Sequence, residues 1–368
     1  MNIAFDAKRA FLNASGLGNY SRSLIKSLSQ NFPQHQYSLF TPQTSSNNFA
    51  QNIVKQKKIS IIEPANKTFS AYWRSFGITN QLKNIDVYHG LSNELPFNIK
   101  LFKGKKIVTI HDLIFLRHPK LYPIIDREIY SLKFKSACSK ADQIVAVSQQ
   151  TKDDIVEFYG TPAEKIKVIY QSCDEPYYKE ISEEDIQDAK KKYNLPADYL
   201  LYVGTIEERK NLLTLIKALS LVKHISLVVV GKQKDYFKKV IEYVNANGLN
   251  KRVLFLNNIT AQELPPIYKS ASVFIYPSLY EGFGIPIIEA LTCKTPVITS
   301  KNGCFEESGG KSTIYIDPLN HEQLADEIEK LLSSSALRKQ IVEAGFEHSK
   351  KFRPEAIAHD MMNLYKNN

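Results

Sequence analysis

Short apolar segments alternate with longer amphipathic segments along almost the whole chain, and this alternation is the main clue to the fold. In the first half, apolar runs rich in β-branched residues predict strands. These predicted strands are Asn2–Asp6, Gln36–Phe40, Lys58–Ile62, Val87–Tyr88, Lys106–Ile110, Asp142–Val147 and Lys167–Tyr170. Apolar residues at helical spacing predict helices over Gly18–Ser29 and Gln150–Tyr159.

The second half repeats this pattern with a new set of strands. They are predicted at Tyr199–Val203, Ser226–Val230, Val253–Leu256, Val273–Tyr276, Pro296–Thr299 and Thr313–Ile316. The helices between them are predicted at Asn211–Val222, Tyr236–Asn247, Ala261–Lys269, Pro286–Thr292 and Leu319–Ser333. Strands that alternate with helices form doubly wound parallel sheets. The sequence therefore predicts an α/β protein with two Rossmann-like domains.

A polar and acidic stretch with two prolines, Pro176 and Pro196, separates the two patterns. We therefore predict an N-terminal domain over 1–172, a hinge or linker over 173–198 and a C-terminal domain over 199–353. A final helix is predicted over 354–368, and this helix could pack back on the N-terminal domain. Ligands of open α/β sheets bind at the carboxyl ends of the strands, so we expect a site in a cleft between two facing domains.

The composition is that of a globular protein, with 43% hydrophobic and 23% charged residues in a chain of 368. The N-terminus leads straight into the first predicted strand without a signal sequence, and no apolar run is long enough to span a bilayer. The cysteines are scattered without a Cys-x-x-Cys pair, which argues against a disulfide framework or a zinc site. These features predict a cytoplasmic protein.

Positive charge is concentrated in the first half of the chain. Residues 1–172 contain 23 Lys and Arg against 12 Asp and Glu, a net charge of +11, whereas the remainder has a net charge of −1. A solvated basic surface without a special partner would explain this excess. Attraction to an anionic membrane or an acidic acceptor would also explain it, so peripheral contact with the inner membrane face through this domain is expected.

The segment Glu281-Gly-Phe-Gly-Ile-Pro-Ile-Ile-Glu289 carries two carboxylates across a glycine loop that leads into a helix. Pro286 suits the first helical turn because its missing N–H would have no partner there. Gly282 and Gly284 let the backbone approach a ligand, and the free N–H groups at the helix start attract an anion. A carboxylate beside a bound anion is electrostatically unfavourable unless it accepts hydrogen bonds from hydroxyl groups of the ligand. A nucleotide sugar, with phosphates between two hydroxyl-bearing groups, fits this pattern.

The segment Gly204-Thr-Ile-Glu-Glu-Arg209-Lys210-Asn211 places two cations directly after a predicted strand and a glycine turn. Arg209 offers a planar guanidinium and Lys210 a compact charge, and both can neutralise a diphosphate leaving group. An Arg-Lys pair at a helix start is usually surface charge. Its position after the strand, together with the two-glutamate segment, favours diphosphate binding.

With these motifs the chain resembles, over nearly its whole length, the retaining glycosyltransferases of family 4, which adopt the GT-B fold. The Glu-x7-Glu motif and the Gly204–Asn211 segment carry most of the resemblance. Further matching segments are Thr295–Ser300, Phe305-Glu306, Ile316–Pro318, Gly16–Ser21, Asp86–Gly90, Thr109–Asp112 and Val147-Ser148. Glu306 follows phenylalanine where the family usually has proline, which leaves its role open.

The resemblance implies catalytic roles for four residues. Arg209 and Lys210 would neutralise the diphosphate as the glycosidic bond breaks. Glu281 would hold the transferred sugar, and His111 would contact it. The donor-binding residues implied by the resemblance are Gly16, Gly18, Gly204, Gly282, Phe283, Gly284, Ile285 and Glu289. Glu289 would hold the ribose hydroxyls. The acceptor-side residues implied are Asp112, His89 and Ser148.

The implied reaction moves a hexose of the mannose, glucose or N-acetylglucosamine type from a nucleotide-diphosphate sugar to an acceptor. This acceptor would be a glycan or a lipid-linked glycan in cell-surface polysaccharide biosynthesis. The departing diphosphate would help to accept the proton of the acceptor. Neither a cofactor nor a metal ion is expected, because the chain lacks a clear Asp-x-Asp pair at a strand end and basic side chains supply the neutralisation.

The same residues also bear on other classes of function. A nicotinamide-dependent oxidoreductase would need an acidic ribose ligand about 20 residues after its glycine loop, yet no Asp or Glu occurs between Asp6 and Glu63. A nucleic-acid partner is not expected, because no basic stripe interleaved with aromatic residues is present. A sugar-nucleotide epimerase of the same fold and a non-catalytic nucleotide-sugar-binding protein remain as alternatives.

Overall fold

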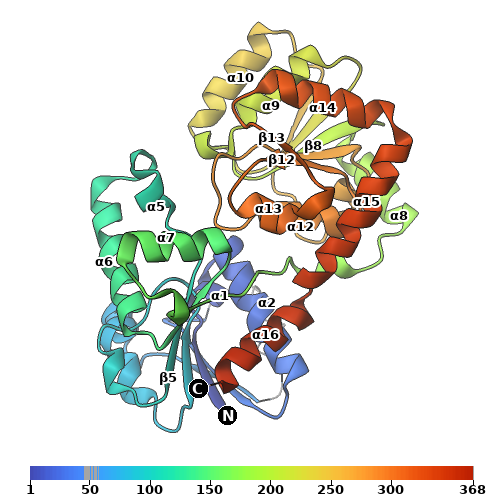
Figure 1. Cartoon of the computed structure of the whole chain (residues 1–368). Helices are drawn as coiled ribbons and strands as arrows, with labels where there is room; N and C mark the ends of the chain where they lie inside the picture. Colours follow the sequence, from blue (N-terminus) through green and yellow to red (C-terminus); the bar gives the residue numbers. More distant parts are fainter. Residues whose placement is uncertain (45–49, 51–52, 54–55, 57, 368) are drawn as a thin grey trace. The chain divides into compact units, whose positions relative to one another are not determined.

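The computed structural model describes residues 1–44, 50, 53, 56 and 58–367 (Figure 1). The chain divides into two compact units, the first made of Met1–Ser172 with Phe352–Asn368 and the second of Cys173–Lys351. Each unit is built on one parallel sheet. The last residue of the predicted terminal helix, Asn368, lies outside the described residues.

The first unit contains a seven-stranded sheet in the order β3-β2-β1-β4-β5-β6-β7. Its strands are β1 (Asn2–Asp6), β2 (Gln36–Phe40), β3 (Ile59–Ile62), β4 (Val87–Gly90), β5 (Lys105–Ile110), β6 (Gln143–Ala146) and β7 (Ile166–Val168). Its α-helices are α1 (Lys8–Leu12), α2 (Gly16–Asn31), α4 (Ser70–Tyr72), α5 (Ile114–Arg117), α6 (Ile124–Lys140), α7 (Gln149–Tyr159) and α16 (Pro354–Lys366). Every strand predicted in the first half is present, with small shifts at the ends.

Both faces of the first sheet are covered, because alternate strand residues point to opposite sides. Ile3 and Phe5 of β1 lie in a buried cluster with apolar residues of α2 and α16. Ala4, between them, lies in a second cluster with Trp73 and with residues of α6 and α7. This explains why the strands are nearly continuous apolar runs rather than alternating ones.

The terminal helix α16 belongs to the first unit, although it follows the second in sequence. The Ser27 hydroxyl on α2 donates to the carbonyl of Pro354 at 2.8 Å, at the start of α16. Near its end, the Tyr365 hydroxyl lies 2.7 Å from Nδ1 of His89. Met361, Met362 and Tyr365 are buried in the cluster on the α2 side of the sheet.

The second unit contains a six-stranded sheet in the order β10-β9-β8-β11-β12-β13. Its strands are β8 (Tyr199–Val203), β9 (Ser226–Val230), β10 (Val253–Leu256), β11 (Val273–Tyr276), β12 (Val297–Ser300) and β13 (Ile314–Ile316). Its α-helices are α8 (Glu183–Tyr193), α9 (Leu212–Leu221), α10 (Tyr236–Ala246), α11 (Leu264–Lys269), α12 (Ile285–Thr292), α13 (Cys304–Gly309), α14 (His321–Ser333) and α15 (Ser335–Ser349). The strands match the predicted positions closely.

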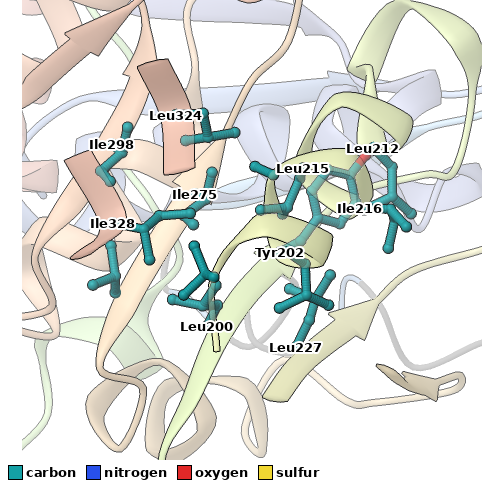
Figure 2. Close-up of a cluster of buried hydrophobic side chains, with 14 of the residues drawn as sticks. Leu200, Tyr202, Leu212, Leu215, Ile216, Leu227, Ile275, Ile298, Leu324 and Ile328 are labelled. Carbon is teal, nitrogen blue, oxygen red and sulfur yellow. The ribbon is translucent and has the colours of Figure 1, made fainter. Parts of the chain in front are cut away.

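The main core of this unit lies between the sheet and helices α9, α10 and α14. Figure 2 shows Leu200 and Tyr202 of β8 beside Leu215 of α9, and Ile275 of β11 near Ile328 of α14. All five side chains are fully buried. This packing makes the central strands rigid, so the loops at their carboxyl ends are held in fixed positions.

The segment 173–198, expected to be a hinge or linker, is folded and belongs to the second unit. It contains α8, which begins with a capping box. The Ser182 hydroxyl accepts from the Asp185 N–H at 3.1 Å, and the Asp185 carboxylate accepts from the Ser182 N–H at 2.8 Å. The helix buries only Ala189, which accounts for the polar sequence of this segment.

Helices α6 and α15 were absent from the predicted elements. In α6, Phe134, Ala137 and Cys138 are buried, but Ile124 and Ile125 are exposed. Apolar residues therefore occur on both sides of the helix. Because sequence reasoning looked for a single apolar face, it did not recognise this helix.

Candidate active site

The strand order of the second sheet reverses between β8 and β11, and a cluster of charged side chains lies at the carboxyl ends of these strands. β8 leads through Gly204 to a short helical turn that carries Arg209 and Lys210. β11 ends at Tyr276, and Glu281 follows in the loop before α12. Ligands of doubly wound sheets bind at such a reversal of strand order.

One oxygen of Glu281 forms the centre of this cluster. Its Oε1 lies 2.7 Å from Nη1 of Arg209 and 3.3 Å from Nζ of Lys210. The same oxygen accepts hydrogen bonds from the hydroxyls of Tyr276 at 2.8 Å and Ser278 at 2.9 Å. The carboxylate is therefore held in one orientation, and it holds both cations beside it.

The charges of Glu281 and Arg209 are fixed over the physiological range. Burial acts to raise the pKa of Glu281, but Lys210 and Arg209 outweigh it and bring this pKa to about 2. Burial acts to lower the pKa of Arg209, but the charge of Glu281 outweighs it and the pKa rises above its usual range. Glu281 is therefore an anion and Arg209 a cation at any pH near neutrality.

Sequence reasoning missed two partners of the cations, Glu207 and Tyr276. Glu207 lies 2.8 Å from Nη2 of Arg209 and 2.5 Å from Nζ of Lys234. Nζ of Lys210 donates to the Tyr276 hydroxyl at 2.7 Å and lies 5.0 Å from the centre of its ring. Tyr276 ends a predicted strand, and Glu207 lies in the motif itself. The positions of these two residues in the sequence were a usable signal for the site. Their contacts with the cations are visible only from the side-chain directions in the structure.

The structure explains the glycines at positions 204 and 284 in different ways. A Cβ on Gly204 would lie 3.1 Å from Cδ of Lys210, so the glycine leaves room for the lysine side chain. Gly284 precedes α12 with a φ of 105°, which L side chains rarely adopt. A Cβ there would lie 3.0 Å from Oγ of Ser308 and 3.2 Å from Cδ1 of Ile287.

The remaining loop residues anchor this turn. Phe283 is buried, and Gly282 is half-buried. Ile285 is the first residue of α12, and Pro286 occupies the first turn as expected. The loop therefore presents backbone at the start of α12, while Phe283 fixes it to the core.

Glu289, in α12, behaves unlike Glu281. The Tyr268 hydroxyl donates to its Oε2 at 2.8 Å. Burial raises the pKa of Glu289 to about 7; the Tyr268 hydrogen bond lowers it only in part, and the charge of Asp174 raises it further. Near neutral pH this carboxyl therefore changes between a protonated and an ionised state.

His111 lies in the first unit, directly after β5. Its Nε2 lies 2.9 Å from the carbonyl oxygen of Leu91, so this nitrogen carries the proton. Its backbone N–H donates to Oδ1 of Asn93 at 2.7 Å, and the Tyr20 ring packs edge-on against the imidazole. Burial lowers the pKa of His111 to about 4, against the effect of the Leu91 carbonyl. The imidazole is therefore neutral at pH 7.

Three other residues expected in the site also belong to the first unit. Asp112 accepts from the backbone N–H of Ile114 at 3.1 Å, which forms a turn after β5. Gly16 and Gly18 begin α2. A Cβ on Gly18 would lie 1.9 Å from the carbonyl oxygen of Asn13, whereas a Cβ on Gly16 would meet nothing within 4 Å.

His89 and Ser148, expected on the acceptor side, are both completely buried. The ring nitrogens of His89 lie 2.7 Å from the Tyr365 hydroxyl and 2.8 Å from the Thr109 hydroxyl. Burial lowers the pKa of His89 to about 3. Ser148 caps α7 by accepting from the N–H of Thr151 at 3.0 Å. These contacts hold both side chains within the first unit, and their acceptor-side roles stay predictions.

The structure thus brings Arg209, Lys210 and Glu281 into direct contact within the second unit, with Glu289 in the adjoining helix. His111, Asp112, Gly16 and Gly18 belong to the first unit. Among the described residues, no group of three or more His, Cys, Asp or Glu side chains is arranged to hold a metal ion. Over the same residues, no helix is both long and apolar enough to cross a membrane.

Comparison with known proteins identifies two family segments. Residues 14–175 match the family described as Glycosyltransferase Family 4, and residues 183–348 match the one described as Glycosyl transferases group 1. The chain is 28% identical to O-antigen chain mannosyltransferase B of Escherichia coli over 290 residues, 76% of this chain and 74% of that protein. It is 29% identical to O-antigen chain mannosyltransferase RfbU of Salmonella typhimurium over 293 residues, 76% and 77% of the two chains.

Solved structures share the fold at low sequence identity. The Anabaena protein HepE, crystallised with UDP and glucose, superposes with a TM-score of 0.78 at 17% identity, over 100% of this chain and 99% of that one. The sucrose-phosphate synthase of Thermosynechococcus elongatus gives a TM-score of 0.78 at 22% identity, over 100% and 98%. Two parallel sheets, the two family segments and these neighbours agree: the chain belongs to the group 1 glycosyltransferases of family 4 and has the GT-B fold.

Proposed function

We propose that this protein is a retaining, metal-independent hexosyltransferase of cell-surface polysaccharide biosynthesis. Its donor would be a nucleotide-diphosphate sugar and its acceptor a glycan or a lipid-linked glycan. The observation that carries this proposal is the convergence of Arg209 and Lys210 on Glu281 where the strand order of the second sheet reverses. The O-antigen mannosyltransferases among its relatives favour a mannosyl donor.

The geometry supports electrostatic stabilisation of a departing diphosphate. Arg209 and Lys210 lie at one edge of the sheet with their directions set by Glu281, Glu207 and Tyr276. Charges that are already oriented stabilise developing negative charge without reorganising during the reaction. The start of α12, preceded by Gly284, adds backbone N–H groups to the same end of β11.

The two glutamates would bind hydroxyls rather than act as an acid and a nucleophile. Glu281 is ionised and surrounded by cations, so it has no proton to donate near pH 7. Glu289, in α12, accepts a hydrogen bond from the Tyr268 hydroxyl of α11 and would accept from ribose hydroxyls once ionised. This division leaves the leaving group itself as the base for the acceptor hydroxyl.

A panel of nucleotide sugars tests the proposal. GDP-mannose, UDP-glucose and UDP-N-acetylglucosamine are each added, and thermal unfolding is followed. A true donor at 100 times its dissociation constant should stabilise the fold by about 2.7 kcal/mol. The stabilising donor is then incubated with a membrane extract that contains acceptors. NMR of the product should show a retained anomeric configuration, and excess chelator should leave the rate unchanged.

The alternatives give different results in the same experiment. An epimerase would convert the sugar nucleotide without an acceptor. A non-catalytic binding protein would be stabilised without any turnover. An inverted anomeric product, or activity lost in chelator and restored by Mg²⁺ or Mn²⁺, would contradict the retaining and metal-independent parts of the proposal. No stabilisation by any member of the panel would contradict the donor class.

A further inference from the structure

Helix α6 carries an apolar stripe that faces solvent. Ile124 and Ile125 at its start are 68% and 74% exposed, and Leu132 is 65% exposed. Ile125, Ile129 and Leu132 follow one another at helical spacing on one side, while Phe134 and Cys138 face the core of the first unit. Leu121, just before the helix, is also exposed. Most of the surface of Ile124, Ile125 and Leu132 is therefore left uncovered.

A second group of exposed apolar residues adjoins the far end of α6. Phe69, Tyr72 and Leu101 are all more than 60% exposed. Tyr72 packs against Phe76 with ring centres 5.3 Å apart, and Phe76 stacks on Phe97 at 5.7 Å.

Lys140, the last residue of α6, joins the two groups. Its Nζ donates to the carbonyl of Phe97 at 2.9 Å and lies 5.3 Å from the centre of the Phe97 ring. The helix and the segment 67–101 pack in one cluster on the same face of the sheet. We call these two groups together the α6 face.

Most large apolar side chains that are exposed among the described residues lie in this part of the chain. Ten of them occur between Phe69 and Leu132, whereas the second unit contributes Leu221, Leu279 and Leu319. Single exposed apolar residues are ordinary on a protein surface, but a concentration of this kind marks an interaction surface.

The same region holds most of the positive charge of the first unit. Residues 67–140 contain 13 Lys and Arg against 5 Asp and Glu, a net charge of +8. Exposed members of this set are Lys67, Lys83, Lys100, Lys103, Lys120 and Lys135. Apolar side chains surrounded by lysines are typical of surfaces that lie in the interface of an anionic bilayer.

We propose that the α6 face binds the surface of an anionic phospholipid bilayer, with its aliphatic and aromatic side chains inserted among the headgroups. A second copy of the chain is a poorer occupant, because two such faces would bring their lysines together. Helix α6 has 17 residues and charged side chains along its length, so it lies in the membrane surface instead of crossing it. This inference stands independently of the proposed reaction.

Co-sedimentation with vesicles tests the proposal on the full chain. Vesicles of phosphatidylcholine mixed with phosphatidylglycerol should bind the protein, and pure phosphatidylcholine vesicles should bind it far more weakly. The double variant Ile124→Ser/Ile125→Ser should weaken binding by more than about tenfold, since it removes two side chains that would be buried in the interface. The double variant Lys120→Gln/Lys135→Gln should weaken binding to the anionic vesicles by roughly fivefold for each lysine removed.

The matched control is Leu221→Ser/Leu319→Ser in the second unit, where the two leucines are 50% and 75% exposed. This control should sediment like the unchanged protein. Circular dichroism and thermal unfolding verify that each variant is folded. Equal binding to both vesicle types, or an unchanged affinity of the folded isoleucine variant, would overturn the proposal. So would a concentration-dependent dimer in analytical ultracentrifugation that the isoleucine variant abolishes while no vesicle binding is found.

Discussion

Arg209 and Glu281 stand far apart in sequence, yet Nη1 of Arg209 lies 2.7 Å from Oε1 of Glu281. The contact joins the loop after β8 to the loop after β11, two neighbouring strands of the second sheet. It also gives each residue the opposite charge that its burial requires. The two motifs singled out in the sequence are therefore parts of one electrostatic unit.

Replacement of Lys210 by alanine should lower the rate of sugar transfer by about 10²–10³-fold, since one preorganised charge at the leaving group is lost. Steady-state kinetics with the donor found in the nucleotide-sugar panel measure the effect. Lys238→Ala is the matched control, because Lys238 is exposed on α10 and makes no contact with the cluster around Glu281. A Lys210→Ala enzyme with near-native turnover would contradict the assigned role.

Replacement of Glu281 by glutamine should destabilise the fold by about 1–3 kcal/mol, because it weakens hydrogen bonds from charged groups in a largely buried cluster. Denaturant titration measures this change. Glu281→Ala should lower turnover more than donor affinity, since both cations lose the group that orients them. An alanine variant with normal turnover but a much weaker donor affinity would show that Glu281 acts chiefly in donor binding.

Donor affinity should depend on pH through Glu289. Its pKa of about 7 means that the carboxylate needed to accept ribose hydrogen bonds is formed as the pH rises from about 6 to about 8. The dissociation constant of the donor should therefore fall over this interval. Glu289→Gln should bind more weakly and lose most of this dependence. Isothermal titration calorimetry of both proteins across the interval checks the prediction, and parallel pH profiles would refute it.

The stability of the fold should also depend on pH through Glu289, but it should fall as the pH rises, whereas donor affinity should rise. The folded pKa of Glu289, about 7, lies above its ordinary value of 4.5, so the folded state binds the proton more tightly. Stability from this group is present below pH 4.5 and is lost as the pH rises through 7. Compared with Glu289→Gln, the unchanged protein should therefore become relatively less stable between these pH values. Urea unfolding of both proteins at a series of pH values measures the difference.

The two glycines that begin α2 should respond differently to alanine. Gly18→Ala should destabilise the fold by about 1–3 kcal/mol, because the new methyl group would overlap the carbonyl oxygen of Asn13. Gly16→Ala should change stability by less than about 1 kcal/mol, since its Cβ meets nothing within 4 Å. Thermal unfolding of the two variants compares them directly. Equal losses would mean that the backbone at α2 adjusts to the methyl group.

The architecture and the main chemical residues could be predicted from the amino-acid sequence. Buried parallel strands are short apolar runs, and the intervals between them must cross over through helices, so both sheets could be predicted from the pattern. The Glu281–Glu289 segment and Arg209-Lys210 were recognisable because glycines, a helix start and opposite charges stand close together in sequence. The exposed polar helix α8 and the helix α6, with its apolar residues on two sides, did not give such a pattern.

How these residues act on one another depends on the folded structure. Glu281 and Glu289 belong to one motif, yet the pKa of the first is lowered to about 2 by two cations and that of the second is raised to about 7 by burial. His89 lies near the end of β4 and His111 directly follows β5, but α16 folds back and covers His89 with Tyr365. Such differences depend on which elements pack together across long stretches of chain, and burial and charge pairing arise only from that packing.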